Sequence, residues 1–410
     1  MKFLIIEQDL RVWGTSQGII SRSFLAKLRT AFPASIIDVV YIKQEKSEDQ
    51  LDLLPIDTIE THIVNLKTPF FTKLFNKIYW RIFHQSLAVE HIHKVYAAII
   101  AKIDYQKYDH IFIRSAGINH EVILAAKDLP ILKKAIVNFH DPYPLFWYAG
   151  TQSQLTNLEL FKFKKMHEVV SQSKTCMSSA QLMAEDMQYL YGSRKKFYHL
   201  PHQYDASVFD LSDVSTVLKK NRKILISYHG AIMFGRNIEI LLDTYIDLIE
   251  NNAVYKENTE FVLRLKGSDL KKMAQKYSSI PNIQVLGMVS FSNSCFEQSH
   301  EADINVILEN GPIYSNTLVG KAPFLAATGK PVFVLAPERS EMRTILKDNQ
   351  YIASYSDAVE IKSKLENLIQ NRLNSDEAVC PFEDYFSDEN FKIHLDAILF
   401  AKGEDNECRN

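Results

Sequence analysis

A repeated pattern of short apolar runs followed by glycine constrains the fold of this chain more than any other feature. Residues 304–308 and 332–335 are apolar and rich in β-branched side chains, which is typical of strands buried on both faces of a parallel sheet. Between them lie a polar loop and a short helical stretch, Lys321 to Thr328, which Gly329 ends. This order of elements predicts a strand–helix–strand unit of an α/β fold.

Three runs upstream repeat the pattern. Apolar strands are predicted over Ile224–Tyr228, Phe261–Leu265 and Ile283–Leu286, and a glycine follows each of them within two residues. Apolar residues at helical spacing follow the first strand, over Asn237–Ile249. Strands that alternate with helices predict a doubly wound parallel sheet, and such a sheet binds its ligands beyond the carboxyl ends of the strands.

The first half of the chain has the same organisation. A strand pattern over Phe3–Ile6 precedes a helical pattern over Ile19–Phe32, and a second strand pattern covers Ser35–Tyr41. Two later apolar runs, within residues 109–117 and 134–142, also predict strands. The N-terminal half is therefore predicted to form a second Rossmann-like sheet.

Two cations of the second half stand where a phosphate ligand would lie. Arg236 begins a helix shortly after Gly230, whose missing side chain lets backbone approach a ligand closely. Lys321 lies at the start of the helical stretch that follows the strand 304–308. On these residues alone, an ordinary strand–helix–strand unit with a solvated lysine is an equal alternative. The repetition of the pattern, with both cations at strand ends, favours the phosphate site.

These segments resemble the C-terminal half of GT-B glycosyltransferases of the group 1 (family four) type. The resemblance rests on HGAIMFGRNIEILL, RLKG, VLGMV, HEADINVIL and SNTLVGKAPFLAATGKPVFV, and it covers about residues 175–360. It implies two Rossmann-like doubly wound domains facing a central cleft. It also implies that the second domain holds a nucleotide-sugar, with no cofactor besides this substrate. It implies that basic residues matching Arg236 and Lys321 contact the donor diphosphate. Gly230, Lys266 and Asn316, which follow predicted strands of the same half, are further candidates for this contact.

One motif of the family is missing from this chain. Family members often carry two carboxylates eight positions apart in the last unit, where this chain has Asn316 and Phe324. Glu309 is the nearest acid, and we treat it as a candidate for contact with the donor sugar.

The resemblance also divides the chain. Polar residues between Pro201 and Asn221 separate the two sheet-like halves. We therefore expect an acceptor-side domain over residues 1–200 and a nucleotide-sugar-binding domain over residues 201–380. The family's last helix crosses back to the first domain, so the helical segment 381–401 is expected to pack there.

Acceptor-side residues are suggested at two strand ends. In the family, the loop after the first strand approaches donor phosphate and acceptor, which makes Gly14, Ser16 and Gly18 candidates for close contact. A surface loop without a ligand is an equal alternative for each of them. His140 and Asp141 follow a buried strand and could act as general base or acceptor anchor. The alternative is that Asp141 only begins a turn before Pro142.

A basic and aromatic stretch lies between His62 and Val89, where no Asp or Glu occurs. Lys73, Lys77 and Arg81 recur at every fourth position and therefore share one helix face. Most of the other positions are aromatic or aliphatic. This pattern predicts peripheral contact of residues 67–83 with an anionic membrane surface. The alternative, which is the commoner outcome, is a core helix whose cations reach into water.

Composition limits the remaining classes of partner. A formal net charge of −2 over 410 residues gives no electrostatic basis for binding nucleic acid. The four cysteines stand far apart without a Cys-x-x-Cys or Cys/His cluster, which predicts a reducing compartment and neither a zinc site nor a disulfide framework. No run approaches the ~20 apolar residues of a membrane span. We expect a cytoplasmic protein. If residues 67–83 bind lipid, it would lie at the inner face of the membrane.

Together these features predict a glycosyltransferase of polysaccharide biosynthesis. It would move a hexosyl- or hexosaminyl-type sugar from a nucleotide-sugar to a glycan or lipid-linked acceptor, without a metal ion, while basic residues stabilise the leaving diphosphate. Two alternatives stay open: a catalytically silent GT-B protein that binds a ligand or partner, and a sugar-nucleotide epimerase on the same scaffold.

Overall fold

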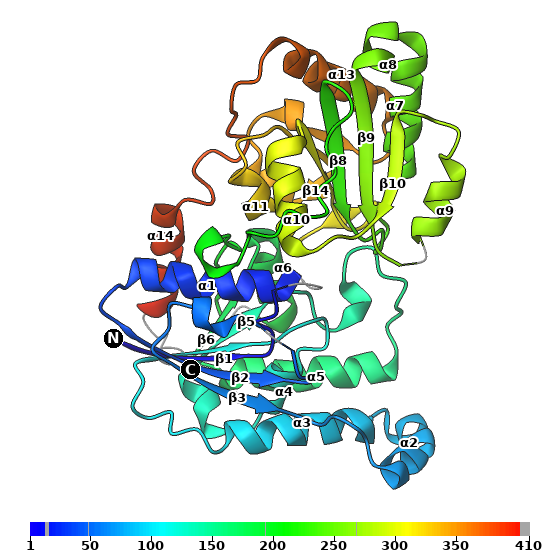
Figure 1. The fold of residues 1–410 in the computed structure, drawn as a ribbon. Coiled ribbons are helices and arrows are strands. Elements are labelled where there is room, and N and C mark those ends of the chain that lie inside the picture. The colour runs from blue at the N-terminus through cyan, green and yellow to red at the C-terminus, as the bar shows by residue number, and fades with distance from the viewer. Residues whose placement is uncertain (13–15, 48, 193, 268, 402–410) are drawn as a thin grey trace. The chain divides into compact units, whose positions relative to one another are not determined.

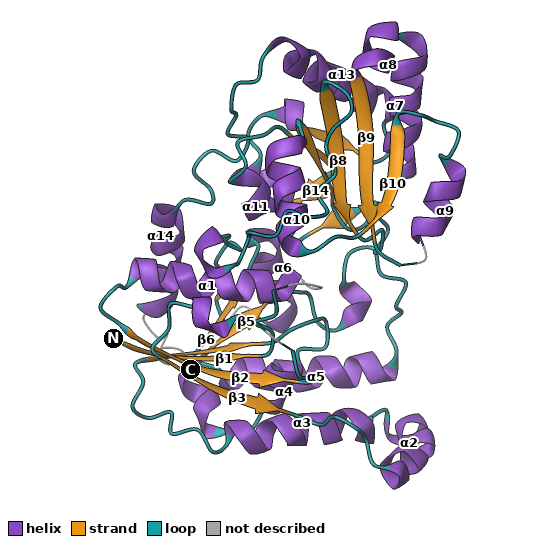
Figure 2. Cartoon of the chain, in the orientation of Figure 1, coloured by secondary structure: helices purple, strands orange, loops and turns teal. Residues whose placement is uncertain are grey.

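The computed structural model describes residues 1–12, 16–47, 49–192, 194–267 and 269–401 (Figure 1). Their packing divides the chain into two compact units. Unit 1 comprises Met1–Tyr148, Gln152–Val208 and the chain from Ser387 onward, and unit 2 comprises Ala149–Thr151 and Phe209–Phe386. Each unit is built on one large parallel sheet with helices on both faces (Figure 2).

The sheet of unit 1 has seven strands in the order β3-β2-β1-β4-β5-β6-β7. The chain alternates between strand and helix, so every neighbouring pair is parallel. The order reverses between β1 and β4, which is the switch point of a doubly wound sheet. The strands are β1 (Lys2–Glu7), β2 (Ile36–Lys43), β3 (Thr58–Ile63), β4 (His110–Arg114), β5 (Ala135–Phe139), β6 (Thr175–Ser178) and β7 (Phe197–His199).

Seven α-helices belong to unit 1 among the described residues. They are α1 (Ser16–Ala31), α2 (Phe70–Phe83), α3 (Leu87–Ile100), α4 (Glu121–Ala125), α5 (Asn157–Gln172), α6 (Gln181–Tyr191) and α14 (Asp388–Leu399). The Ser86, Thr156 and Ser387 hydroxyls each accept a hydrogen bond from a first-turn backbone amide and so begin α3, α5 and α14.

The sheet of unit 2 repeats this topology with six strands in the order β10-β9-β8-β11-β13-β15. Its switch point lies between β8 and β11. The strands are β8 (Ile224–Gly230), β9 (Thr259–Leu265), β10 (Ile283–Gly287), β11 (Ile304–Leu308), β13 (Val332–Ala336) and β15 (Ile352–Ser354), and a separate ladder joins β12 (Tyr314–Ser315) to β14 (Arg339–Ser340). The α-helices are α7 (Glu239–Asn251), α8 (Ala253–Asn258), α9 (Asp269–Lys276), α10 (Phe291–Phe296), α11 (Ala322–Ala326), α12 (Glu341–Ile345) and α13 (Ala358–Asn374).

These two sheets confirm the predicted α/β class with two Rossmann-like, doubly wound parts. The apolar runs became strands because both faces of each sheet are covered: every residue of β5, β11 and β13 is buried.

The last helix is shorter than predicted. It occupies Asp388–Leu399 rather than 381–401, because the chain turns at Glu383 (φ 48°) and the helix starts only at the Ser387 cap. The helix packs within unit 1, where Asp388 pairs with Lys27 at 2.7 Å and Phe391 lies edge-on to Phe24.

Candidate functional site

Two loops meet at the switch point of unit 2. The loop after β8 contains Phe234 and Gly235, and the loop after β11 contains Gly311. The Gly311 amide donates to the Phe234 carbonyl at 2.7 Å. Both glycines have positive φ, and a Cβ on Gly235 would lie 3.3 Å from Cδ of Pro312. The close contact of the loops therefore depends on glycine at these positions.

This contact brings together the two cations that the sequence singled out. The Lys321 residue is partly exposed, but its ammonium group points inward, donates to the His229 carbonyl and lies 4.5 Å from the centre of the Tyr228 ring. A Cβ on Gly230 would lie 3.1 Å from Lys321 Nζ, so glycine makes room for the lysine. Arg236 donates from Nη1 to the Ala231 carbonyl at 3.1 Å.

The charge of this cation pair is not balanced by the protein. Among the described residues, neither Lys321 nor Arg236 forms an ion pair with a carboxylate. Burial, followed by the nearby charge of Arg236, lowers the pKa of the Lys321 ammonium from 10.5 to about 7. In addition, the buried Nε of Arg236 has no hydrogen-bond partner. A bound anion would supply the missing charge and the missing acceptor.

The other predicted diphosphate residues lie near the same edge of the sheet. Lys266 follows directly after Leu265, which is paired in register with Gly230, and its side chain is exposed. Asn316 is fully buried and follows β12 in the stretch between β11 and α11. Contacts of a ligand with these residues remain a prediction.

Glu309, the candidate for sugar contact, is fully buried at the end of β11. Its Oε2 accepts from the Ser340 hydroxyl, and its Oε1 accepts from the Met342 amide at 3.3 Å, so the carboxyl group caps the start of α12. Burial raises its pKa from 4.5 to about 8, against the effect of the two hydrogen bonds. These contacts favour a structural role in holding α12, and a sugar contact remains a prediction.

In unit 1, His140 and Asp141 follow β5 as predicted. The side-chain amide nitrogen of Asn138 lies 3.1 Å from His140 Nε2. The His140 ring stacks on the His202 ring with centroids 5.4 Å apart. With the amide donating to Nε2, the ring proton is on Nδ1, which is buried and without a partner. Asp141 accepts from the Tyr148 hydroxyl at 2.9 Å, and burial raises its pKa. The structure thus presents a neutral histidine that can donate from Nδ1.

An ion pair at the switch point of unit 1 was not predicted from the sequence. Glu7 and Arg114 end the paired strands β1 and β4, face each other in register and form a buried salt bridge. Burial raises the pKa of Glu7 to about 7, and the charge of Arg114 opposes this shift. Arg114 Nη2 has no hydrogen-bond partner. Burial, followed by the charge of Arg114, lowers the pKa of His140 and of His202. The available signal was a charged residue at the end of each apolar run.

Three candidates for contact with a ligand, Gly14, Ser16 and Gly18, follow the first strand in the sequence. Gly14 lies outside the described residues, and Ser16 is exposed at the first position of α1. Gly18 is buried in α1, and a Cβ there would lie 2.2 Å from the Arg11 carbonyl oxygen. Gly18 is therefore required by the backbone of the protein itself, and its contact with a ligand remains a prediction.

A polar cavity of about 550 Å³ opens at the carboxyl edge of the unit 1 sheet. Its volume lies within the range of small-molecule sites. Gln8 donates to both Tyr96 and Glu121 at 3.0 Å, and the Arg11 guanidinium holds the Asp9 carboxylate with two bonds. The lining is almost entirely polar and includes Gln8, Asp9, Arg11, Gln17, Tyr41, Lys43, Gln44, Glu45, Ser47, Asn119 and Glu121.

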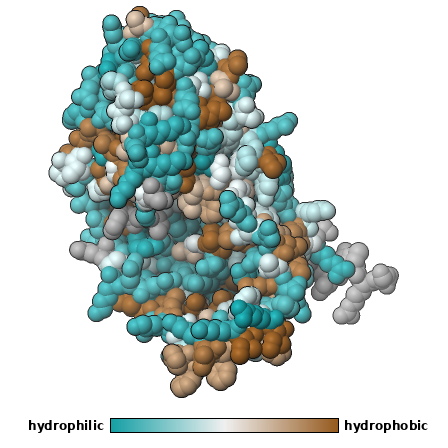
Figure 3. Space-filling view, turned by 90° about the vertical axis from the view of Figure 1, so that its right-hand side faces the viewer, coloured by the Kyte–Doolittle hydropathy of each residue, from teal (hydrophilic) through white to brown (hydrophobic). Residues whose placement is uncertain are grey.

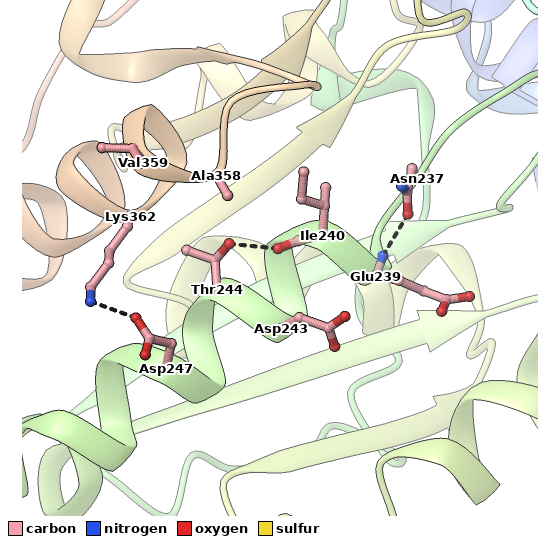
Figure 4. Close-up of a pocket in the computed structure, with 9 residues that line it drawn as sticks. All are labelled: Asn237, Glu239, Ile240, Asp243, Thr244, Asp247, Ala358, Val359 and Lys362. Atoms are coloured by element: carbon pink, nitrogen blue, oxygen red, sulfur yellow. Dashed lines mark hydrogen bonds and ion pairs between the residues drawn. The ribbon is translucent and has the colours of Figure 1, made fainter.

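A shallow hollow on unit 2 lies between α7 and α13 (Figure 4). Its acidic residues are already paired, since Asp247 binds Lys362 and Glu239 binds Lys272 and Lys276. The Asn237 side chain accepts from the Glu239 backbone amide at 3.0 Å in the turn before α7. This surface therefore has no unbalanced charge for a ligand. Among the described residues, no group of three His, Cys, Asp or Glu side chains could hold a metal ion.

Known structures share this fold over almost the whole chain. A UDP-GlcNAc 2-epimerase from Neisseria meningitidis, bound to UDP-GlcNAc, is 16% identical over 98% of this chain and 100% of its own, with a TM-score of 0.58. The lipopolysaccharide outer core galactosyltransferase WaaB is 11% identical over 98% and 99%, with a TM-score of 0.58. A UDP-forming trehalose-phosphate synthase from Burkholderia vietnamiensis is 9% identical over 98% and 100%, also at 0.58.

At these identities the likeness shows the fold alone. The chain has the two-domain GT-B fold that glycosyltransferases and UDP-GlcNAc 2-epimerases share. The assignment within that fold to the family four type is not specified by these matches. No family model and no curated protein matches the sequence.

Proposed function

We propose that the protein is a glycosyltransferase that moves a hexosyl- or hexosaminyl-type sugar from a nucleotide-sugar to a glycan or lipid-linked acceptor. The observation that carries this proposal is the pair of cations, Lys321 and Arg236, without a carboxylate partner among the described residues at the switch point of unit 2. Structures that share the fold support the donor class, because one is bound to UDP-GlcNAc and another to UDP-2-fluoro glucose.

The chemistry follows from the leaving group. Negative charge develops on the diphosphate as the bond to the sugar breaks. Lys321 and Arg236 would stabilise that charge, helped by backbone amides near Gly230 and Asn316, in surroundings that exclude much of the solvent. Lys266 would contact the diphosphate from the neighbouring strand. In this proposal the cations stabilise the leaving diphosphate without a metal ion.

The acceptor would bind to unit 1. His140 would orient the acceptor hydroxyl by donating from Nδ1, and Asp141 would orient or deprotonate that hydroxyl. The polar cavity supports a glycan acceptor, because its lining offers many donors and acceptors for sugar hydroxyls. The proposal includes contact of residues 67–83 with the inner face of a membrane, where a lipid-linked acceptor in polysaccharide biosynthesis would lie. No described helix is both long enough and apolar enough to cross a bilayer.

Binding of nucleoside diphosphates tests the proposal directly. A thermal-shift screen against UDP, GDP, ADP and CDP identifies the base, and calorimetry then compares variants. We expect Lys321→Ala and Arg236→Ala each to weaken binding about 10- to 100-fold, the value of a hydrogen bond to a charged group. Lys272→Ala, an exposed lysine of the same unit, is the matched control. Wild-type affinity in both site variants would show that the site is misplaced.

A sugar-nucleotide epimerase is the second candidate, because UDP-GlcNAc 2-epimerases share the fold over the whole chain. An epimerase would convert the donor to its epimer without releasing free nucleoside diphosphate when an acceptor is added. A catalytically silent binding protein would bind the nucleotide and leave the sugar-nucleotide intact. Chromatography of the reaction mixture therefore separates the three functions.

A further inference from the structure

Helix α2 has one narrow side, without large aliphatic residues, against the protein and leaves its apolar side in solvent. None of its 14 residues is buried. Thr72, Asn76 and Tyr79 are half-buried, and the Asn76 side chain accepts from the Leu87 amide at the start of α3 at 2.7 Å. A core helix would have the opposite orientation, so the alternative of a core helix is wrong for this segment.

The outward face carries large apolar side chains. At 3.6 residues per turn, residues 70, 71, 74, 75, 78 and 82 lie together on one side of the helix. Their exposed fractions are 74% for Phe70, 70% for Phe71, 49% for Leu74, 64% for Phe75, 64% for Ile78 and 61% for Ile82. Figure 3 shows apolar side chains gathered at the lower end of the molecule, where α2 lies in Figure 1. Such a contiguous patch is typical of a binding surface.

Positive charge borders this face. Lys73, Lys77 and Arg81 follow one another along the flank of α2, and no Asp or Glu occurs between residues 61 and 89. Among the described residues, none of the three cations forms an ion pair. An apolar face bordered by unpaired cations is complementary to a bilayer that contains anionic lipids.

The rest of unit 1 holds α2 in place. The helix ends at His84, whose left-handed backbone closes it, and His84 Nε2 lies 3.1 Å from the Asn157 amide nitrogen at the start of α5. The helix is about 21 Å long at 1.5 Å per residue, which is too short to span a bilayer.

We propose that α2 lies in the plane of an anionic membrane and inserts Phe70, Phe71, Phe75 and their apolar neighbours among the lipid chains. This inference deepens the membrane contact in the proposed function, but its evidence and its test do not depend on glycosyl transfer. A second copy of the chain is a poorer occupant, because a symmetric contact would bring the same row of cations together from both partners.

Vesicle co-sedimentation separates the contributions of charge and insertion. We expect wild-type protein to bind vesicles of phosphatidylglycerol and phosphatidylcholine more tightly than vesicles of phosphatidylcholine alone. Lys73→Gln, Lys77→Gln and Arg81→Gln combined should weaken binding to the anionic vesicles roughly 100-fold, at about fivefold per cation near the surface. Phe71→Ser, Phe75→Ser and Ile78→Ser combined should remove binding to both. Val359→Ser, a 79% exposed apolar residue of α13, is the matched control.

A tryptophan on the apolar face, Phe75→Trp in a Trp80→Phe background, reports insertion independently of sedimentation. Its fluorescence should shift to the blue when anionic vesicles are added, and the shift should be absent when Phe71→Ser and Ile78→Ser are added to this variant. Failure of the wild type to bind anionic vesicles, or unchanged binding by the triple serine variant, would overturn the inference. So would a dimer in light scattering that the serine variant dissociates. Nucleoside diphosphate binding, measured on the same variants, reports the proposed function separately.

Discussion

Replacement of Lys321 by methionine tests whether burial of the charged ammonium group lowers the free energy of unfolding. The unfolded chain holds the Lys321 proton up to about pH 10.5 and the folded protein only up to about pH 7. Between these values the unfolded state binds more protons, so stability rises with pH, and the full penalty of burying the charged ammonium applies below pH 7. At 1.36 kcal/mol per unit, the penalty reaches at most about 5 kcal/mol below pH 7. It decreases as the pH rises from 7 to 10.5 and is absent above that range.

Methionine removes the charge while it keeps much of the side-chain volume. It also removes the hydrogen bond to the His229 carbonyl, which costs about 1–3 kcal/mol at every pH. The sum predicts that Lys321→Met stabilises the nucleotide-free protein by about 2–4 kcal/mol at pH 6. At pH 9 the gain should be smaller by about 2–3 kcal/mol, because part of the penalty is already absent there.

Urea unfolding followed by circular dichroism at pH 6 and pH 9 measures both values. Lys272→Met, an exposed lysine on α9, controls for the substitution itself and should stay within about 0.5 kcal/mol of wild type at both pH values. If Lys321→Met destabilises the protein equally at the two pH values, the ammonium group is not enclosed as described. The argument for an anion site at this position then fails.

Three further predictions concern Glu309, the binding of a nucleoside diphosphate and His140. Glu309→Gln should stabilise the protein more at pH 8.5 than at pH 5.5 in urea unfolding, because burial raises the pKa of Glu309 from 4.5 to about 8 and the folded state loses stability across this range, where only the unfolded carboxyl group is ionised; an equal effect at both pH values would indicate an ionised carboxylate. Binding of a nucleoside diphosphate at pH 8 should take up close to one proton, seen as a calorimetric enthalpy that varies with the ionisation enthalpy of the buffer, and much less at pH 6. His140→Phe retains a ring against His202 but removes both ring nitrogens, so kcat/KM should fall on the order of 10²- to 10⁴-fold; unchanged kinetics would assign His140 to packing.

The sheets could be predicted because each buried strand can be recognised from its own residues alone. A strand buried on both faces is apolar at almost every position, so runs such as 304–308 and 135–139, each with a single Asn, stand out without any knowledge of their neighbours. The short ladder between β12 and β14 gave no such signal, since two residues show no periodicity. The start of α14 depended on the Ser387 cap rather than on the apolar pattern that precedes it.

The environment of individual site residues could not be predicted from the sequence. The pKa of Lys321 is lowered by burial and then by the charge of Arg236. Its ammonium group donates to the His229 carbonyl, 92 positions away in the sequence. Glu7 and Arg114 are separated by 107 positions and meet only because β1 and β4 are neighbours at the switch point. The sequence pattern of α2 fits both a membrane helix and a core helix, the commoner case, and only its packing shows which side faces the protein.

The charges at the switch point of unit 2 favour an anionic ligand, and the polar cavity of unit 1 supports the proposed transfer over epimerisation. Lys321 and Arg236 lack a carboxylate partner among the described residues, and burial raises the pKa of Glu309 to about 8, so this acid is largely neutral at pH 7 and does not balance them. Asn316 and Phe324 are uncharged and do not balance them either. An epimerase would need no second substrate. The proposed transferase would use the polar cavity of unit 1 to bind a glycan and the outward apolar face of α2 to reach a lipid-linked one.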